Sequence, residues 1–177
     1  MARIVFVYGL ISGLVVIGGI IATVVLNGDT PHGNVWLGYL IMLLGLSLVL
    51  VGVKQYRDQV RGGVIGFLPA LGVGLAIAVL ASLAYVAAWE AYLAATDYAF
   101  MDQYVSATLQ ARRAEGLTGE AYKALERDLA EMAVNYRSPV FRLPMTFIEI
   151  FPVGVLVALV SAGLLRNSRF LPAKSRS

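Results

Sequence analysis

Four stretches of the sequence are apolar for about as long as a helix needs to cross a lipid bilayer. They comprise residues 4–26, 35–53, 64–88 and 143–165. A membrane-spanning α-helix takes about 20 mostly apolar residues. Lipid offers no hydrogen-bond partner to an unpaired backbone group, so apolar segments of this length cross it as helices. The sequence therefore predicts an all-α membrane protein in which residues 1–177 form a single integral domain with four transmembrane helices.

The composition supports a membrane protein and argues against several other classes. Hydrophobic residues make up 59% of the chain and charged residues 14%, whereas a soluble domain carries about 25% charged residues. The chain has no cysteine and one histidine, His32, so it lacks the ligands of the common zinc sites. No glycine-rich phosphate loop follows a predicted strand. We therefore predict no metal site, no cofactor and no nucleic-acid partner.

The polar segment between the third and fourth apolar stretches has a different composition. Residues 97–142 carry about half of the charged side chains, with seven acids and six bases almost balanced. Apolar residues recur at spacings of three and four, which is typical of two helices packed along a seam; they are Tyr122, Leu125, Leu129, Met132 and Tyr136. The pattern predicts a two-helix hairpin outside the membrane, at about residues 97–137, between the third and fourth transmembrane helices.

The basic residues predict the orientation of the chain in the membrane. Eight of the fourteen lie at the N-terminus, in residues 54–63 or after residue 165, whereas the loop at residues 27–34 has none. Short cytoplasmic loops of membrane proteins carry an excess of Lys and Arg, while long loops translocate largely regardless of charge. We therefore expect a multi-pass membrane protein with both termini cytoplasmic and the hairpin on the outer side.

One carboxylate interrupts the fourth apolar stretch. Glu149 lies within a Phe-Ile-Glu-Ile-Phe run, and Pro152 follows three residues later. Hydrocarbon does not solvate a carboxylate, so Glu149 must face other helices, water or a partner. Pro152 has no backbone N–H, so the carbonyl of Ile148 loses its usual helical partner. Glu149 has two open interpretations, a packing residue that fixes the helices or a group that takes part in transport or ligand binding.

Other polar residues are predicted to lie at the same side of the membrane as Glu149. Glu90 ends the third apolar stretch, His32 lies in the first loop and Tyr39 begins the second stretch. Arg142 precedes Glu149 by two helical turns, and its long side chain has the reach to approach that carboxylate. A convergence of these groups is the candidate site, while an interfacial Glu90 and a solvated His32 are the simpler alternatives.

Two classes of function remain open from the residues alone. The leading hypothesis is a non-enzymatic accessory or small oligomeric protein that contacts a second copy or another membrane protein through small-residue helix faces. Such faces are formed by Gly9 with Gly13, by Gly74 with Ala78, and by Gly154 with Ala158. The alternative is a small proton- or ion-coupled transporter or channel that uses Glu149. An enzyme is disfavoured, because no nucleophile lies at a recognisable spacing from a base.

Several motifs along the chain resemble one family. They are Gly38-Tyr-x-x-Met42, Gly52-Val-Lys54-x-Tyr56-Arg57-Asp58, Gly62-Gly63-Val-Ile-x-Phe67, Trp89-Glu90-x-Tyr92 and Phe141-Arg-x-x-Met145-Thr-Phe-x-Glu149-Ile-Phe-Pro-Val-Gly154. Together they are similar to the bacterial membrane family called domain of unknown function number forty-one ninety-nine. The resemblance covers nearly the whole chain. It implies a small four-span protein of bacterial inner membranes, and it implies no activity, substrate or cofactor.

Overall fold

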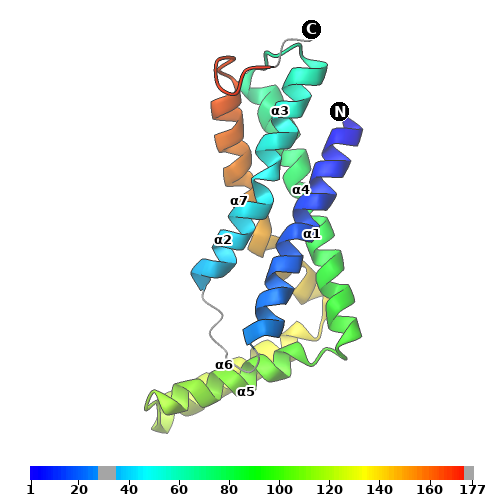
Figure 1. Ribbon diagram of the computed structural model, residues 1–177. Coiled ribbons are helices and arrows are strands. Elements are labelled where there is room, and N and C mark those ends of the chain that lie inside the picture. The colour runs from blue at the N-terminus through cyan, green and yellow to red at the C-terminus, as the bar shows by residue number, and fades with distance from the viewer. Residues whose placement is uncertain (28–34, 174–177) are drawn as a thin grey trace.

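The computed structural model describes residues 1–27 and 35–173, and in this part of the chain every regular element is a helix. The helices are α1 (Ala2–Asn27), α2 (Val35–Leu46), α3 (Leu48–Val60), α4 (Phe67–Ala95), α5 (Phe100–Ala114), α6 (Gly119–Tyr136) and α7 (Pro139–Leu165). Figure 1 shows the long helices side by side, with α5 and α6 beyond one end of them. The predicted all-α fold with a helical hairpin is confirmed.

Four segments are long and apolar enough to cross a membrane. They are Ala2–Val25, Trp36–Val60, Phe67–Ala95 and Pro139–Leu165. The N-terminus and the end of α7 lie at one end of the bundle and the hairpin lies at the other (Figure 1). The four-span prediction therefore fits the structure. The basic end and the hairpin end that the sequence indicated lie at opposite ends of the long helices.

The second span differs in detail from its prediction. α2 and α3 follow each other directly, with Ser47 between them, and helix continues to Val60, so most of the residues expected to form a loop are helical. The Ser47 hydroxyl donates a 2.6 Å hydrogen bond to the carbonyl of Leu44, a local bond of the kind that bends helices. The Lys54–Asp58 ion pair, 2.5 Å long, joins residues one turn apart and supports the extra turns of helix.

α4 is the central helix of the bundle, with its most extensive contacts to α1 and α7 and further contacts to α3. Small residues allow the backbones to approach closely. A Cβ built on Gly13 would lie 2.4 Å from the carbonyl oxygen of Ala81, and one on Gly154 would lie 2.9 Å from the Cβ of Ala78. The small-residue faces found in the sequence therefore pack against each other within this chain.

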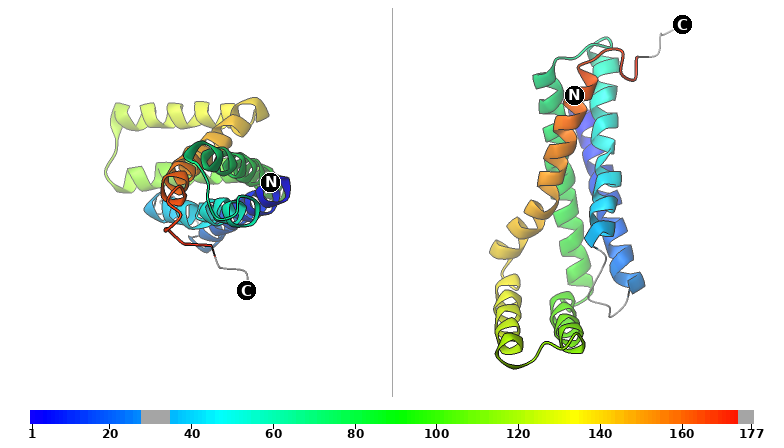
Figure 2. Two further views of the ribbon diagram at one scale, coloured as in Figure 1. Left: turned by 90° about the horizontal axis from the view of Figure 1, so that it is seen from above. Right: turned by 90° about the vertical axis from the view of Figure 1, so that its left-hand side faces the viewer.

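The hairpin crosses the end of the bundle instead of extending it. α5 and α6 pack against each other, lie at a steep angle to the long helices and project to one side (Figures 1 and 2). α7 contains Pro144 and Pro152, and Figure 2 shows its first half leaning away from the other long helices while its second half runs beside them. Because proline cannot donate the helical hydrogen bond, these residues account for the bend.

The opposite end of the bundle is closed by a buried arginine. Arg57 is fully buried, and its guanidinium donates hydrogen bonds to the Asp58 carboxylate, to the carbonyl of Phe170 at 2.9 Å and to the carbonyl of Leu171. The segment after α7 is thereby fixed across the end of α3. The sequence indicated only the side of the membrane for this residue, since the two carbonyls that it binds lie more than 100 positions away.

Candidate functional site

The end of α4 and the start of α7 are joined by an ion pair between Glu90 and Arg142. Nε and Nη2 of Arg142 donate to the two carboxylate oxygens of Glu90, at 2.6 and 2.7 Å. The Arg142 side chain is 3% exposed and that of Glu90 is 25% exposed. A guanidinium and a carboxylate that meet through two parallel bonds form the stronger kind of ion pair, so this contact fixes the two helix ends relative to each other.

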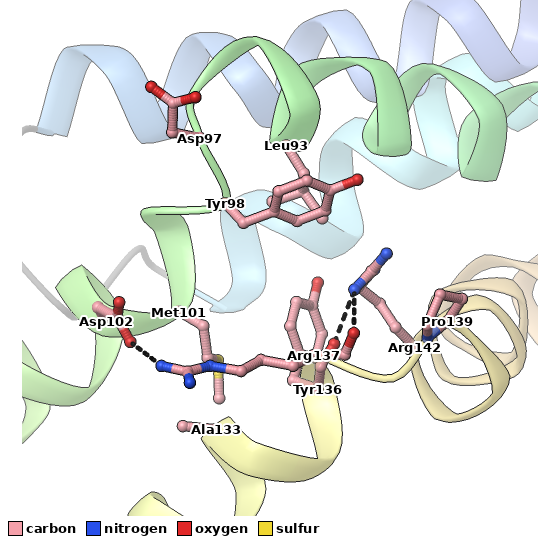
Figure 3. A pocket seen from close by; sticks show the side chains of 10 residues that line it. All are labelled: Leu93, Asp97, Tyr98, Met101, Asp102, Ala133, Tyr136, Arg137, Pro139 and Arg142. Atoms are coloured by element: carbon pink, nitrogen blue, oxygen red, sulfur yellow. Dashed lines mark hydrogen bonds and ion pairs between the residues drawn. The ribbon is translucent and has the colours of Figure 1, made fainter.

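Arg142 also holds the end of the hairpin. Its Nη1 donates to the backbone carbonyl of Tyr136 at 2.8 Å and to that of Arg137 at 3.3 Å, as Figure 3 shows. The guanidinium carbon lies 5.0 Å from the centre of the Tyr98 ring and 5.7 Å from that of the Tyr136 ring. Arg142 therefore uses its hydrogen-bonding and aromatic contacts to connect α4, α6 and α7.

The turn between α4 and α5 places Tyr98 on this arginine. Asp97 and Tyr98 both have positive φ angles, 51° and 55°, in a region that residues other than glycine adopt at a cost. The N–H of Tyr98 donates to the carbonyl of Leu93 at 2.8 Å, which satisfies one of the last carbonyls of α4. Two adjacent left-handed residues reverse the chain sharply and direct the Tyr98 ring toward Arg142 (Figure 3).

Two cavities flank this junction, and we name them for later use. The hairpin cavity, of about 430 Å³, lies between the end of α4, the hairpin and the start of α7; its lining includes Tyr98, Asp102, Arg137 and Arg142, drawn in Figure 3. The Glu149 cavity, of about 310 Å³, lies between α1, α4, the hairpin and α7. Met101 and Tyr136 line both of them, so the cavities are neighbours separated by hairpin residues.

The Glu149 cavity combines one carboxylate with a mostly apolar and aromatic wall. Its lining residues are Ile20, Val24, Tyr85, Trp89, Phe100, Met101, Tyr104, Met132, Tyr136, Met145, Thr146 and Glu149. They come from five helices, three of them membrane-spanning and two in the hairpin. The cavity therefore exists only because the hairpin lies across the end of the bundle.

Glu149 keeps exposed surface at this cavity. Its side-chain partner is the hydroxyl of Tyr85, a buried residue of α4. Glu149 forms no salt bridge among the described residues. Arg142, which the sequence placed on the same helix face, turns instead to Glu90. The carboxylate of Glu149 thus faces the cavity without a cationic side chain beside it in the described part of the chain.

Trp89 and Tyr136 connect the bundle to the hairpin on the other side of the cavity. Nε1 of Trp89 donates a 2.8 Å hydrogen bond to the Tyr136 hydroxyl, and the Trp89 ring meets that of Phe100 edge to face, with centroids 4.9 Å apart. Burial raises the pKa of the Tyr136 phenol above its ordinary value. The phenol therefore remains protonated at neutral pH, as a polar but uncharged group beside Glu149.

The structure brings together some of the residues that the sequence singled out. Glu90 and Arg142 are partners, and Glu149 lies farther along α7 on the neighbouring cavity. Tyr39 is half-exposed near the start of α2 and does not line either cavity. His32 lies outside the described residues, so its predicted place near Glu149 stays a prediction. Pro152 lies within α7, one turn beyond Glu149.

Three residues of the site were missed by the sequence analysis. No site role was predicted from the sequence for Tyr85 or Trp89, and Tyr136 was placed only in the hairpin seam, but all three line the Glu149 cavity. The spacing of four between Tyr85 and Trp89 places them on one face of α4, which is a usable signal. Nothing local to Tyr136 indicates its contact with Trp89, because the two residues are 47 positions apart.

The arrangement can hold a molecule but offers few groups for chemistry on it. Within residues 1–27 and 35–173, no three side chains of the His, Cys, Asp or Glu type gather closely enough to hold a metal ion. The polar groups on the Glu149 cavity are one carboxylate, one threonine and the hydroxyls of its tyrosines, with the Trp89 N–H engaged by Tyr136. Such a site favours recognition of a partly apolar ligand.

Comparison with known proteins identifies a family but no activity. No curated protein and no solved structure shows a significant match to the chain. The sequence model of one family matches residues 7–167, which include the hairpin, three of the membrane-spanning segments in full and most of the first, Ala2–Val25. The chain therefore belongs to the family described as "Protein of unknown function (DUF4199)".

Proposed function

We propose that the protein is a non-enzymatic, multi-pass membrane protein that binds a small amphiphilic molecule in the Glu149 cavity. The observation that carries the proposal is the cavity of about 310 Å³ between the membrane-spanning helices and the hairpin. Ligand sites commonly have volumes of about 300–1,000 Å³ and a mostly apolar wall with a few polar groups. The cavity meets both conditions, and its lining from several helices allows a ligand to link bundle and hairpin.

The proposed location is the bacterial inner membrane, with both termini in the cytoplasm and the hairpin outside. The excess of basic residues at the end with the termini supports this orientation, because cytoplasmic ends of membrane helices carry more Lys and Arg. In this orientation the Glu149 cavity lies at the outer side of the membrane. A ligand then enters from the outer leaflet or from the space beyond it.

Binding is favoured over transport through a single chain. Proton- or ion-coupled transport by Glu149 needs a polar route from the cavity to the other end of the bundle. The interior along that direction is packed with fully buried apolar side chains, among them Leu46, Val49, Val53 and Ile77. This packing supports a ligand that enters and leaves on the same side, and transport stays the alternative function.

An accessory or oligomeric role is a second proposal that the glycines on the surface favour. Gly18 and Gly163 have no atom within 4 Å of the place where a Cβ would stand, so they leave room for a helix of a second copy or of another membrane protein. Light scattering of the protein in nanodiscs tests this proposal, since a stable dimer doubles the protein mass per disc. A single mass of one chain contradicts self-association.

Ligand binding is tested with tryptophan fluorescence. The chain has two tryptophans, and Trp36→Phe leaves Trp89 in the cavity wall as the only reporter. We use the protein in phosphatidylglycerol nanodiscs and titrate a bromoalkane with a tert-butyl end group, whose bromine quenches a nearby indole. If the molecule binds in the cavity, quenching of Trp89 saturates, whereas partition into lipid alone gives a signal that rises without saturation.

A matched pair of variants separates the cavity from the surrounding lipid. Val24→Phe places a larger side chain in the cavity lining, and Val25→Phe makes the same change at a 65% exposed neighbour outside the lining. We expect Val24→Phe to abolish saturable quenching and Val25→Phe to preserve it. Equal quenching in both variants, with unchanged helix content by circular dichroism, contradicts the proposed site.

A further inference from the structure

We propose that the ligand of the Glu149 cavity is an amphiphilic organic cation, such as a quaternary ammonium or an amine with an alkyl chain, whose charged group lies against Glu149. This inference rests on the proposed function and adds the chemical class of the ligand. Its three supports are the charge of the cavity, the nature of its wall and the small number of oxygen ligands in the described lining.

The charge of the cavity favours a cation. Glu149 is the one acidic residue among the described residues of the lining, and no Lys, Arg or His accompanies it there. Arg142, which the sequence suggested as a neighbour of Glu149, is bound at both carboxylate oxygens of Glu90, so that pair is neutral as a whole. In surroundings of low dielectric constant an unmatched carboxylate attracts a cation strongly, and the ligand supplies the charge that the chain does not.

The wall of the cavity favours an organic cation. Five aromatic residues line it, and the ring of Trp89 is held by Phe100 and by the hydrogen bond to Tyr136. Aromatic faces attract ammonium groups, and cages of aromatic residues are a recurrent way to bind quaternary ammonium. Methionine and branched apolar residues on the lining, such as Met132 and Ile20, provide an apolar surface for the alkyl part.

Inorganic cations and zwitterions fit this cavity less well. Calcium takes about six to eight oxygen ligands, and magnesium retains several waters in an octahedral shell, whereas the cavity offers one carboxylate with a few hydroxyls. The phosphate of a zwitterionic lipid headgroup would find no cationic side chain in the described lining. A cation with an apolar tail and no anionic group can contact the Glu149 carboxylate, the aromatic rings and the apolar side chains of the lining.

The test compares three probes of one shape that differ in charge. The probes are an ω-bromooctyl-trimethylammonium salt, the carbon isostere in which a tert-butyl group replaces the ammonium group, and ω-bromooctanesulfonate. Each is titrated against the Trp36→Phe protein in phosphatidylglycerol nanodiscs, with saturable quenching of Trp89 as the readout. The same titrations are made with Glu149→Gln and with Asp102→Asn, which removes one acid from the hairpin outside the Glu149 cavity.

We expect the ammonium probe to bind about tenfold or more tightly than its carbon isostere, and the sulfonate not to bind saturably. Glu149→Gln removes this preference and leaves binding of the carbon isostere intact, while Asp102→Asn keeps the preference. Equal affinities for the ammonium probe in wild type and Glu149→Gln overturn the inference but leave the binding function standing. Failure of all three probes to quench Trp89 saturably overturns the binding function itself.

A last titration distinguishes a free cation from a lipid headgroup. The ammonium probe is titrated again in nanodiscs that contain phosphatidylethanolamine in place of half of the phosphatidylglycerol. We expect an unchanged affinity after correction for the probe's partition into each bilayer, measured with empty discs. If phosphatidylethanolamine weakens binding of the ammonium probe in the protein with Glu149 but not in Glu149→Gln, the lipid's amine headgroup occupies the site. That result overturns the choice of a free amphiphilic cation as the ligand.

Discussion

At the scale of single residues, the two intramembrane acids play different parts. Glu90 has a dedicated partner, because both of its oxygens accept from Arg142. Glu149 has, among the described residues, the Tyr85 hydroxyl as its side-chain partner, and it is an exposed residue in the lining of a cavity. An ion pair with several satisfied hydrogen bonds is a structural element, whereas a carboxylate without a counter-charge is open to a ligand.

The pairing of Glu90 with Arg142 is tested by a double-mutant cycle. Glu90→Gln leaves a buried guanidinium without its counter-charge, so we expect it to lower the free energy of unfolding by about 2–3 kcal/mol, near the lower end for broken buried pairs because Glu90 is partly exposed. Arg142→Met on the Glu90→Gln background restores part of this loss. Unfolding in mixed micelles by denaturing detergent measures all four proteins.

The control for this cycle is an exposed pair of the same chemistry. Arg112 and Glu115 form a 2.8 Å contact on the hairpin, with side chains 49% and 54% exposed. We expect Arg112→Met to change stability by less than about 1 kcal/mol, as is usual for surface pairs. If Glu90→Gln costs no more than Arg112→Met, the Glu90–Arg142 pair does not hold the two helix ends together.

At the scale of helices, close backbone contacts set the shape of the bundle. α1 approaches α4 so closely at Gly13 that a side chain there would overlap the backbone of Ala81. In lipid no hydrophobic force drives helices together, so packing between small residues contributes much of the association. The bend of α7 separates helices instead of bringing them together. It moves the first half of α7, which lines the Glu149 cavity, away from the other long helices.

Two glycines on α1 provide a matched test of this packing. Gly13→Ala forces a methyl group against the carbonyl oxygen of Ala81, so we expect a loss of stability of about 1–3 kcal/mol, as for other overpacked sites. Gly18→Ala meets nothing within 4 Å, and it gains up to about 1 kcal/mol from helix propensity. Thermal unfolding of both variants in detergent decides the matter, and equal melting temperatures contradict the close contact.

The bend of α7 is tested through Pro152. Pro152→Ala supplies the missing N–H and permits the bond to the carbonyl of Ile148, so we expect a straighter α7 and weaker quenching of Trp89 by the bound probe. Pro69→Ala is the control, because Pro69 lies in the first turn of α4, where the N–H has no helical partner. Unchanged probe affinity in Pro152→Ala shows that the cavity does not depend on the bend.

At the scale of the whole molecule, the two ends of the bundle are chemically different. The end with the termini is closed by Arg57 and by the segment after α7. The other end is covered by the hairpin, which rests on the Arg142 junction and leaves two cavities beside it. A protein closed at one end and hollow at the other is suited to receive a ligand from one side of the membrane.

The absence of cysteine makes the orientation simple to test. Single cysteines are introduced by Glu115→Cys in the loop of the hairpin and by Ser168→Cys after α7, and no native thiol competes. We expect a membrane-impermeant maleimide to label Glu115→Cys in intact bacterial cells and Ser168→Cys only after the cells are permeabilised. The reverse pattern places the hairpin in the cytoplasm and removes the outer-leaflet entry of the ligand.

The sequence by itself determined the four spans, the hairpin and the presence of an acid in the fourth span. Each of these depends on local composition and on helical spacing, because lipid imposes helices on any apolar segment of sufficient length. The same rules identified the small-residue faces, which do pack, although the sequence left open whether they would do so within one chain or between chains.

Only the tertiary structure decided which polar group meets which. Arg142 and Glu90 are 52 residues apart, Trp89 and Tyr136 are 47 apart, and Arg57 binds carbonyls more than 100 residues away. Sequence spacing favoured Glu149 as the neighbour of Arg142, but the guanidinium binds the carboxylate of Glu90 near the end of α4. Glu149 faces a cavity because the hairpin crosses the end of the long helices instead of continuing along their direction. No local sequence pattern encodes the angle between the hairpin and the bundle.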